Sequence, residues 1–169
     1  MMKYGTNVEQ MEWSMVKEEG KHVPAKRVDI VSVRLLKESS LLYKDRSIRS
    51  PQDGYNLFKQ FLGELDREYF VIICLNVKNQ PTAISVCHIG NLNSCIVSPR
   101  EIMKTAILSN AASIILLHNH PSGHPKPSQE DIDVTRRLKD AGSIIGIDVL
   151  DHLVIGDESF VSLKEEGHL

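Results

Sequence analysis

The sequence of 169 residues has no large excess of charge of either sign. Its 20 Lys and Arg residues are offset by 22 Asp and Glu residues, which gives a formal net charge of −2. No global basic field is therefore present to hold nucleic acid. No apolar run approaches the ~20 residues that a membrane-spanning helix needs, and the polar N-terminus does not resemble a signal peptide. We expect no association with membranes.

Cysteine is scarce and unpaired in the sequence. Its three cysteines, Cys74, Cys87 and Cys95, are odd in number and form no C-x-x-C pair. Two of them fall in apolar runs typical of strands, which predicts buried free thiols rather than disulfides. Without a signal peptide, this pattern favours a reducing cytoplasm.

The remaining composition is that of an ordinary globular protein, with 41% apolar and 25% charged residues. We predict a single domain over residues 46–169, because a chain of this length most simply forms one domain with an extension. Residues 1–45 are the predicted extension, partly flexible. Neither internal repeats nor low-complexity segments occur.

Several apolar runs have the length and pattern of strands. Residues 28–35 alternate between apolar and polar, which predicts a strand with one buried face. Residues 69–77 are almost continuously apolar, which predicts a strand buried on both faces. Further strands are predicted at 82–89, 94–97, 113–118, 143–150, 152–156 and 159–162.

Three segments carry signals of helix starts. Ser50 and Pro51 begin the first helix, which runs to about residue 66. The run Ser98-Pro99-Arg100-Glu101 is a capping box that opens a second helix to about residue 110. The third is predicted from Ser128 to Ala141, with Gly142 as its C-terminal stop. Strands and helices in this order predict an α/β fold with a single mixed sheet flanked by helices.

The most informative segment lies between the strand at 113–118 and the third helix. His118 and His120 are two residues apart, so their side chains point the same way on an extended backbone. Asp131 can return on the first turn of the helix as a third ligand. Two imidazoles and one carboxylate, with an open fourth position, form the ligand set of a catalytic zinc site. Ser128 lies where a hydroxyl could donate to a developing oxyanion.

These residues resemble a known family. The pattern His118-x-His120-Pro121, followed by Ser128 and Asp131, is similar to the JAMM signature of the JAB/MPN metalloprotease superfamily. The longer strings His-Asn-His-Pro-Ser-Gly from residue 118, Ser-Pro-Arg-Glu from 98 and Asp-His-Leu-Val-Ile-Gly from 151 resemble the bacterial RadC group. The resemblance covers roughly residues 45–163 and implies a JAB/MPN-like fold, whose layout is like that of cytidine deaminases.

The resemblance also implies roles for the residues. It implies one zinc ion per chain on His118, His120 and Asp131, with a water as fourth ligand and Ser128 stabilising the oxyanion. The family uses an upstream glutamate as general base, and the matching position here is Glu68. Glu64 and Glu101 compete for this role. The implied substrate is a peptide or isopeptide bond, cleaved when a carboxylate takes a proton from zinc-activated water.

Other interpretations of single residues stay open. Ser128 and Asp131 also form an S-x-x-D helix start, so Ser128 could cap the helix without any catalytic role. His152, which follows Asp151, is better suited to orienting a ligand or the loop than to binding metal itself. His124 is expected to be exposed and could contact substrate.

Three other functions compete with a zinc metallopeptidase. An accessory or binding module in DNA repair or processing, with a structural metal, is the main alternative, although structural zinc usually has four protein ligands. A nuclease is disfavoured because no carboxylate-rich two-metal cluster occurs, and a zinc deaminase because its H-x-E and P-C-x-x-C motifs are absent. Residues 1–45 lack the Gly-x-Gly turns of a DNA-binding helix-hairpin-helix, and the oligomeric state is not predicted.

Overall fold

The structure is a computed structural model that describes residues 26–63, 65–90 and 97–169. Within these residues, every helix and strand lies in one compact unit, Val33–Leu169. In chain order the elements are α1 (Pro51–Leu62), β1 (Tyr69–Leu75), β2 (Pro81–Ile89), α2 (Pro99–Leu108), β3 (Ser113–Asn119), α3 (Gln129–Ile145), β4 (Asp148–Ile155) and β5 (Phe160–Ser162).

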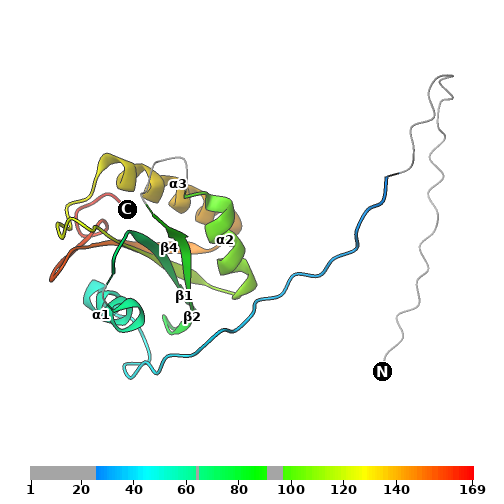
Figure 1. Cartoon of the computed structure of the whole chain (residues 1–169), viewed down its shortest axis with the longest axis horizontal. Coiled ribbons are helices and arrows are strands. Elements are labelled where there is room, and N and C mark those ends of the chain that lie inside the picture. Colours follow the sequence, from blue (N-terminus) through cyan, green and yellow to red (C-terminus); the bar gives the residue numbers. More distant parts are fainter. Residues whose placement is uncertain (1–25, 64, 91–96) are drawn as a thin grey trace, which may run out of the picture. The chain divides into compact units, whose positions relative to one another are not determined.

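The five strands form one mixed sheet in the order β2-β1-β3-β4-β5 (Figure 1). Strands β3 and β4 run parallel and are joined through α3, whereas the other neighbouring pairs are antiparallel. A parallel pair requires a crossover connection of this kind. The predicted α/β fold with a single mixed sheet flanked by helices is confirmed.

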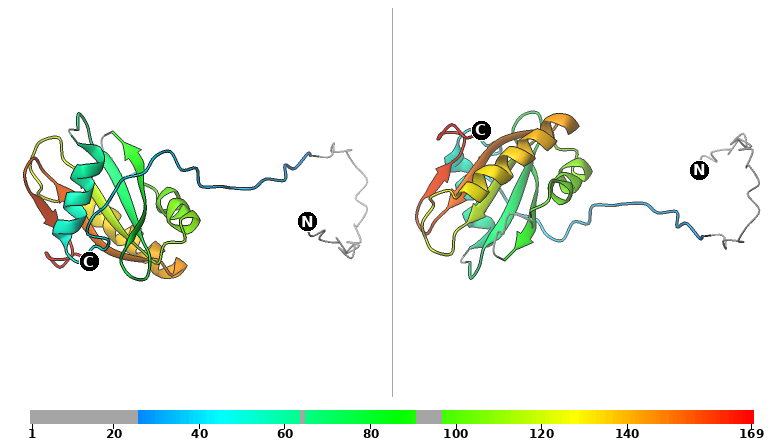
Figure 2. Two further views of the ribbon diagram at one scale, coloured as in Figure 1. Left: turned by 90° about the horizontal axis from the view of Figure 1, so that it is seen from below. Right: turned by 90° about the horizontal axis from the view of Figure 1, so that it is seen from above.

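Helices cover both faces of the sheet, with α1 on one side and α2 and α3 on the other (Figure 2). On β1, Val71 and Ile73 pack toward α1, whereas Phe70 and Ile72 pack toward α2 and α3. Both faces of this strand are therefore buried, as its nearly continuous apolar sequence predicts.

The helix starts follow the predictions in position but not always in bonding. The N-terminus of α1 has a complete capping box between Ser50 and Asp53. Helix α2 begins at Pro99 as predicted, but the Ser98 side chain makes no capping hydrogen bond. The predicted capping box at this helix is therefore wrong. The Glu101 carboxylate instead pairs with Lys104 at 2.8 Å on the exposed side of α2.

Helix α3 does not stop at Gly142. It continues to Ile145, and Gly146 ends it with a left-handed backbone at φ 81°. Gly142 is buried, and a Cβ atom there would lie 2.3 Å from the carbonyl oxygen of Ile147. A glycine is needed at residue 142 because the chain approaches closely there, and not because the helix ends.

The strands after α3 also differ from their prediction. Residues 143–145 still belong to α3, and a single strand, β4, replaces the two predicted at 143–150 and 152–156. The polar pair Asp151 and His152 looks like a break in the sequence, yet both residues are buried inside β4. The strand predicted at 94–97 lies almost entirely outside the described residues.

The strand predicted at residues 28–35 is not formed. Residues 26–42 have neither helix nor strand, and Val28 and Ile30 are 82% and 102% exposed. Alternating apolar residues favour a strand only where a neighbouring strand accepts their hydrogen bonds, and none of the described residues pairs with this segment. The division of the chain at residues 45 and 46 stays a prediction.

Candidate metal centre

Sheet register brings Glu68 beside the histidines. Strands β1 and β3 are antiparallel, and Phe70 lies opposite His118. The beginning of β1 therefore meets the end of β3. Glu68 directly precedes β1, and its carboxylate together with His118 and His120 offers ligand atoms that lie within 4.8 Å of one another. This Glu-His-His group could hold a metal ion.

Helix α3 brings the third predicted ligand to the same place. The Ser128 hydroxyl accepts a hydrogen bond from the Asp131 backbone N–H at 3.1 Å. In return, Asp131 Oδ2 accepts from the Ser128 backbone N–H at 2.7 Å and from its hydroxyl at 2.6 Å. The predicted S-x-x-D helix start is thus present as a full capping box. Because of this box, the Asp131 carboxylate is held rigidly at the start of the helix.

The three predicted zinc ligands converge. His118 Nε2 lies 3.0 Å from His120 Nε2 and 3.1 Å from Asp131 Oδ1, and His120 Nε2 lies 3.5 Å from Asp131 Oδ2. Ligand atoms about 2.0–2.2 Å from a tetrahedral zinc ion lie roughly 3.3 Å apart. The spacing and the chemistry of these donors therefore fit such an ion.

The ligand positions differ in exposure. The side chains of His118 and Asp131 are 0% and 4% exposed, whereas that of His120 is 19% exposed. Glu68 is also partly exposed. The group is therefore anchored in the interior, and His120 and Glu68 are its partly exposed members.

The charges of the group are strongly coupled. Burial alone would raise the pKa of Asp131, but the adjacent His118 and His120 rings and the Ser128 hydroxyl outweigh it and hold that pKa well below its usual value. The Asp131 carboxylate raises the pKa of His120, against the opposing effect of burial. Asp131 is therefore an ionised carboxylate in the interior, where it needs a positive partner.

His152 contacts the group from the adjacent strand. Its Nε2 lies 2.8 Å from His118 Nδ1, and its Nδ1 lies 2.5 Å from the Thr135 hydroxyl. The ring is fully buried, and burial holds its pKa well below the usual value. The contact is of the kind expected for a residue that orients a metal ligand.

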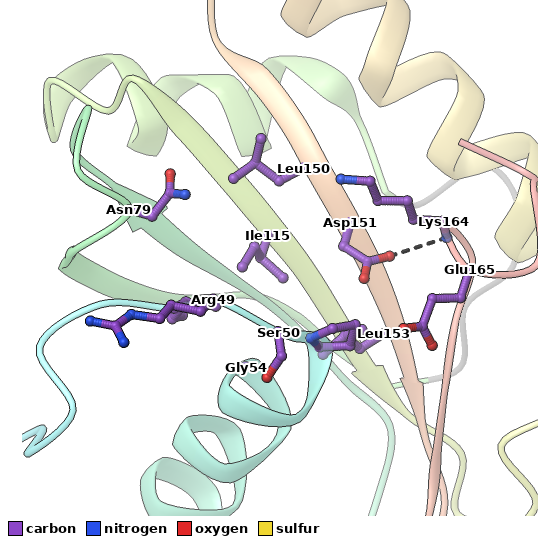
Figure 3. A pocket seen from close by; sticks show the side chains of 12 residues that line it. Arg49, Ser50, Gly54, Asn79, Ile115, Leu150, Asp151, Leu153, Lys164 and Glu165 are labelled. Atoms are coloured by element: carbon purple, nitrogen blue, oxygen red, sulfur yellow. Dashed lines mark hydrogen bonds between the residues drawn. The ribbon is translucent and has the colours of Figure 1, made fainter.

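Asp151, the neighbour of His152, faces a cavity on the other side of the sheet (Figure 3). Its Oδ1 accepts hydrogen bonds from the backbone N–H groups of His152 and Lys164 at 2.7 and 3.2 Å, and its Oδ2 accepts from the Ser162 hydroxyl at 2.7 Å. Asp151 thus ties β4 to the segment after β5. The cavity, of about 320 Å³, is lined by residues of the α1 side, including Gly54, Ile115 and Leu153.

The other candidates lie as follows. Glu101 is paired with Lys104 on α2 and is not part of the Glu-His-His group. Glu64, the remaining alternative base, lies outside the described residues. His124 is exposed, as expected, and its backbone carbonyl oxygen accepts a hydrogen bond from His120 Nδ1 at 2.9 Å.

Two supporting residues were missed by the sequence reasoning. Asn119 bonds with its side chain to the backbone on both sides of Glu68. No sequence signal points to it, because the contact depends on how β1 and β3 are aligned. Thr135 on α3 is the second of these residues. Its position four residues after Asp131, one helical turn further on, is a signal that could have found it.

Comparisons with known proteins agree on one family. The model of the RadC-like JAB domain matches residues 48–168. The chain is similar to a UPF0758 protein of Geobacillus sp. (strain WCH70), with 55% identity over 78% of this chain and 58% of the relative. It is 57% identical to the UPF0758 protein YsxA of Bacillus subtilis (strain 168), over 72% of this chain and 53% of that protein.

A UPF0758 protein of Geobacillus thermodenitrificans (strain NG80-2) is 50% identical over 86% of this chain and 66% of its own length. The chain thus spans between about half and two thirds of the length of these relatives. Among the described residues, no helix is long and apolar enough to cross a membrane.

Proposed function

Because the chain belongs to the RadC-like JAB domain family, we propose that it is a metal-dependent hydrolase that cleaves an amide bond, in a peptide or an isopeptide. In this proposal His118, His120 and Asp131 hold a zinc ion, and Glu68 is the general base. The convergence of these four side chains from β1, β3 and α3 is the observation that carries it.

Zinc suits this donor set, which leaves a fourth position without a protein ligand. When bound, the ion would lower the pKa of a coordinated water to about 7 and polarise the substrate carbonyl. The buried Asp131 carboxylate and the two imidazoles supply one negative charge in total, so a divalent ion on these three ligands would keep one positive charge that the Glu68 carboxylate faces. A site of that sign favours the developing oxyanion of amide hydrolysis.

In this proposal Glu68 moves the proton. Its carboxylate shares the partly exposed side of the group with His120. It would accept a proton from the attacking water and pass it to the leaving amine, which otherwise departs poorly. Proximity to the two imidazoles within 4.8 Å supports this role.

Ser128 has two roles to reconcile. Its hydroxyl hydrogen is engaged with Asp131 Oδ2 at 2.6 Å, and its oxygen caps α3. To donate to an oxyanion, the hydroxyl hydrogen would have to turn away from Asp131. We propose that Ser128 both caps the helix and stabilises the oxyanion, and the two roles are separable by experiment.

The first test is metal content. Purified untagged wild-type protein should contain about one zinc ion per chain by mass spectrometry, and the variant Asp131→Ala should have lost it. No zinc in the wild type, and no uptake when zinc is added, would remove the proposed enzyme.

The second test separates metal binding from catalysis. Wild-type protein loaded with zinc is assayed against peptide and isopeptide libraries, beside Glu68→Gln and the control Glu101→Gln. We expect Glu68→Gln to keep its zinc and lose cleavage, and Glu101→Gln to keep both. Full zinc loading with no cleavage of any amide substrate would favour an accessory module instead, and retention of DNA at low salt would then be measured.

A further inference from the structure

His118 stands in a chain of hydrogen bonds that leads back into the protein. From the metal group, the chain runs from His118 Nδ1 to His152 Nε2 at 2.8 Å, and from His152 Nδ1 to the Thr135 hydroxyl at 2.5 Å. It ends where that hydroxyl meets the carbonyl oxygen of Asp131 at 2.6 Å. The side chains of His118, His152 and Thr135 are fully buried, so water does not compete for these bonds.

The last hydrogen bond of this series fixes which atom donates in each of the others. A carbonyl oxygen can only accept, so the single hydroxyl hydrogen of Thr135 is donated to Asp131. The Thr135 oxygen must then accept from His152, which places the hydrogen of His152 on Nδ1. His152 Nε2 is left as an acceptor and takes the hydrogen of His118 Nδ1.

The direction of these hydrogen bonds decides which nitrogen of His118 is free to bind a metal ion. With its hydrogen on Nδ1, neutral His118 presents a bare Nε2 lone pair, and Nε2 is the atom that faces His120 and Asp131. The opposite direction would put a hydrogen on His118 Nε2 and block it as a ligand.

His120 reaches the same state by a shorter route. Its Nδ1 lies 2.9 Å from the backbone carbonyl oxygen of His124, again an atom that can only accept. Both imidazoles therefore have their hydrogen on Nδ1, on the side away from the proposed metal position, and present Nε2 toward it.

We propose that Thr135 and His152 are positioning residues that set the tautomer of His118 and so prepare it for metal binding. The inference rests on the proposed role of His118 as a zinc ligand. It assigns a function to a helix threonine that touches no ligand atom itself, and it joins α3, β4 and β3 around the site. Asp131 takes part at both ends of this series of hydrogen bonds. Its side chain lies beside His118 and His120, and its backbone carbonyl oxygen accepts the last bond, from Thr135.

The direction of the chain can be measured without any metal. Long-range ¹H–¹⁵N correlation spectra of the histidine side chains distinguish the two neutral tautomers. We expect the hydrogen of His152 on Nδ1 in both the metal-free and the zinc-loaded wild-type protein. A hydrogen on Nε2 of His152 would overturn the inference and leave the proposed hydrolase untouched.

Zinc affinity measures the consequence. Thr135→Val keeps the shape of the side chain and removes the hydroxyl, and we expect zinc to bind at least about 10-fold more weakly, as for other losses of partners behind metal ligands. Thr135→Ser restores the hydroxyl and should bind within about 3-fold of the wild type. Affinities are obtained by competition with a chromophoric chelator.

A control variant separates this effect from the loss of a threonine hydroxyl elsewhere in the protein. Thr82, on β2, also donates its hydroxyl to a backbone carbonyl, that of Cys74 on β1, at 3.2 Å. Thr82→Val should leave zinc affinity unchanged. Equal zinc affinity in Thr135→Val and the wild type would overturn the positioning role. Absence of zinc binding in every form would overturn the proposed function, while the tautomer of His152 would still be decided.

Discussion

The side-chain oxygen of Asn119 accepts a hydrogen bond from the backbone N–H of Tyr69 at 2.8 Å. Its amide nitrogen donates to the backbone carbonyl of Arg67 at 2.9 Å. Glu68 lies between these two backbone groups, so one side chain holds the chain on both sides of it. Asn119 itself lies between His118 and His120 in the sequence, which links the position of the proposed base to the strand that carries the imidazoles.

Replacing Asn119 by Ala should disturb Glu68 more than the metal. The two lost hydrogen bonds should cost about 1–3 kcal/mol of stability in total, since each such bond contributes about 0.5–1.5 kcal/mol. In the cleavage assay kcat should fall about 10- to 100-fold, because small misplacements of a catalytic group are costly. Zinc affinity should stay within about 3-fold, and the Tyr69 amide should exchange its hydrogen faster.

Asn76 offers the matched control at the other end of β1. Its side-chain oxygen accepts hydrogen bonds from the backbone N–H groups of Lys78 and Gln80 at 2.9 and 3.1 Å. Asn76→Ala should lower stability by a similar amount and leave kcat unchanged. If both variants lose kcat alike, Asn119 acts only through general stability.

Ser128 and Ser50 form the two capping boxes of the described chain, with Asp131 and Asp53 as their partners. Replacing either serine by Ala should therefore cost about 1 kcal/mol in denaturant unfolding. Only Ser128→Ala should also weaken zinc binding, because only there does the serine hold a proposed metal ligand. Equal zinc affinity in both variants would show that the box does not hold Asp131 for the metal.

The catalytic share of Ser128 requires a second comparison. If Ser128 also stabilises an oxyanion, kcat at saturating zinc should fall about 100-fold in Ser128→Ala. In Ser50→Ala kcat should stay at the wild-type value. A wild-type kcat in Ser128→Ala, once zinc is restored, would leave Ser128 as a helix cap alone.

Burial raises the pKa of the Cys87 thiol from 9.0 to about 12. Below pH 9 the thiol is protonated in both states and does not affect the pH dependence. Between pH 9 and 12 the unfolded chain loses this proton while the folded chain keeps it, so stability falls as pH rises, by up to about 1.4 kcal/mol per pH unit. Unfolding free energies of wild type and Cys87→Ala at pH 8 and pH 10 measure this directly.

The variant should lose less stability than the wild type over that interval, because the other titrating groups are shared. Equal losses in the two proteins would show that the Cys87 thiol is not shielded. The prediction that the cysteines are buried free thiols is confirmed for Cys74, which is fully buried, and Cys87 is partly buried. Cys95 lies outside the described residues.

Local signals in the sequence were sufficient for much of the fold. The apolar run from Tyr69 predicted a central strand because such a run is stable only between two covered faces. Ser50 and Ser128 predicted where α1 and α3 begin, because a serine hydroxyl can bond an unpaired N–H group of the first turn. Pro99 marked the start of α2, where a missing N–H costs nothing. The ligand pattern of His118, His120 and Asp131 was visible because a strand followed by a capped helix places the three side chains at one point.

Features that depend on tertiary neighbours could not be predicted from the sequence. Residues 28–35 have the pattern of a strand, but the sequence does not say whether another strand lies beside them. Asp151 falls between two predicted strands because the partners that allow it and His152 to be buried lie in β5, β3 and α3. The contact of Asn119 with the backbone around Glu68 joins residues about fifty positions apart.

Gly142 provides the sharpest test of such a tertiary cause. In an ordinary helix interior, alanine is more stable than glycine by about 1 kcal/mol. Here a Cβ atom would lie 2.3 Å from the Ile147 carbonyl oxygen, which belongs to the backbone and cannot simply turn away. We expect Gly142→Ala to destabilise the protein by about 1–3 kcal/mol, as overpacking does elsewhere.

Gly146→Ala is the control, since no atom lies within 4 Å of its Cβ position and only its positive φ is strained. That strain should cost about 1–2 kcal/mol. Denaturant unfolding of both variants distinguishes the two causes when Gly142→Asn and Gly146→Asn are added. Asparagine tolerates a left-handed backbone, so it should recover stability at residue 146 and lose still more at residue 142. A gain in stability for Gly142→Ala would mean that residue 142 is an ordinary helix-interior position with room for a Cβ atom.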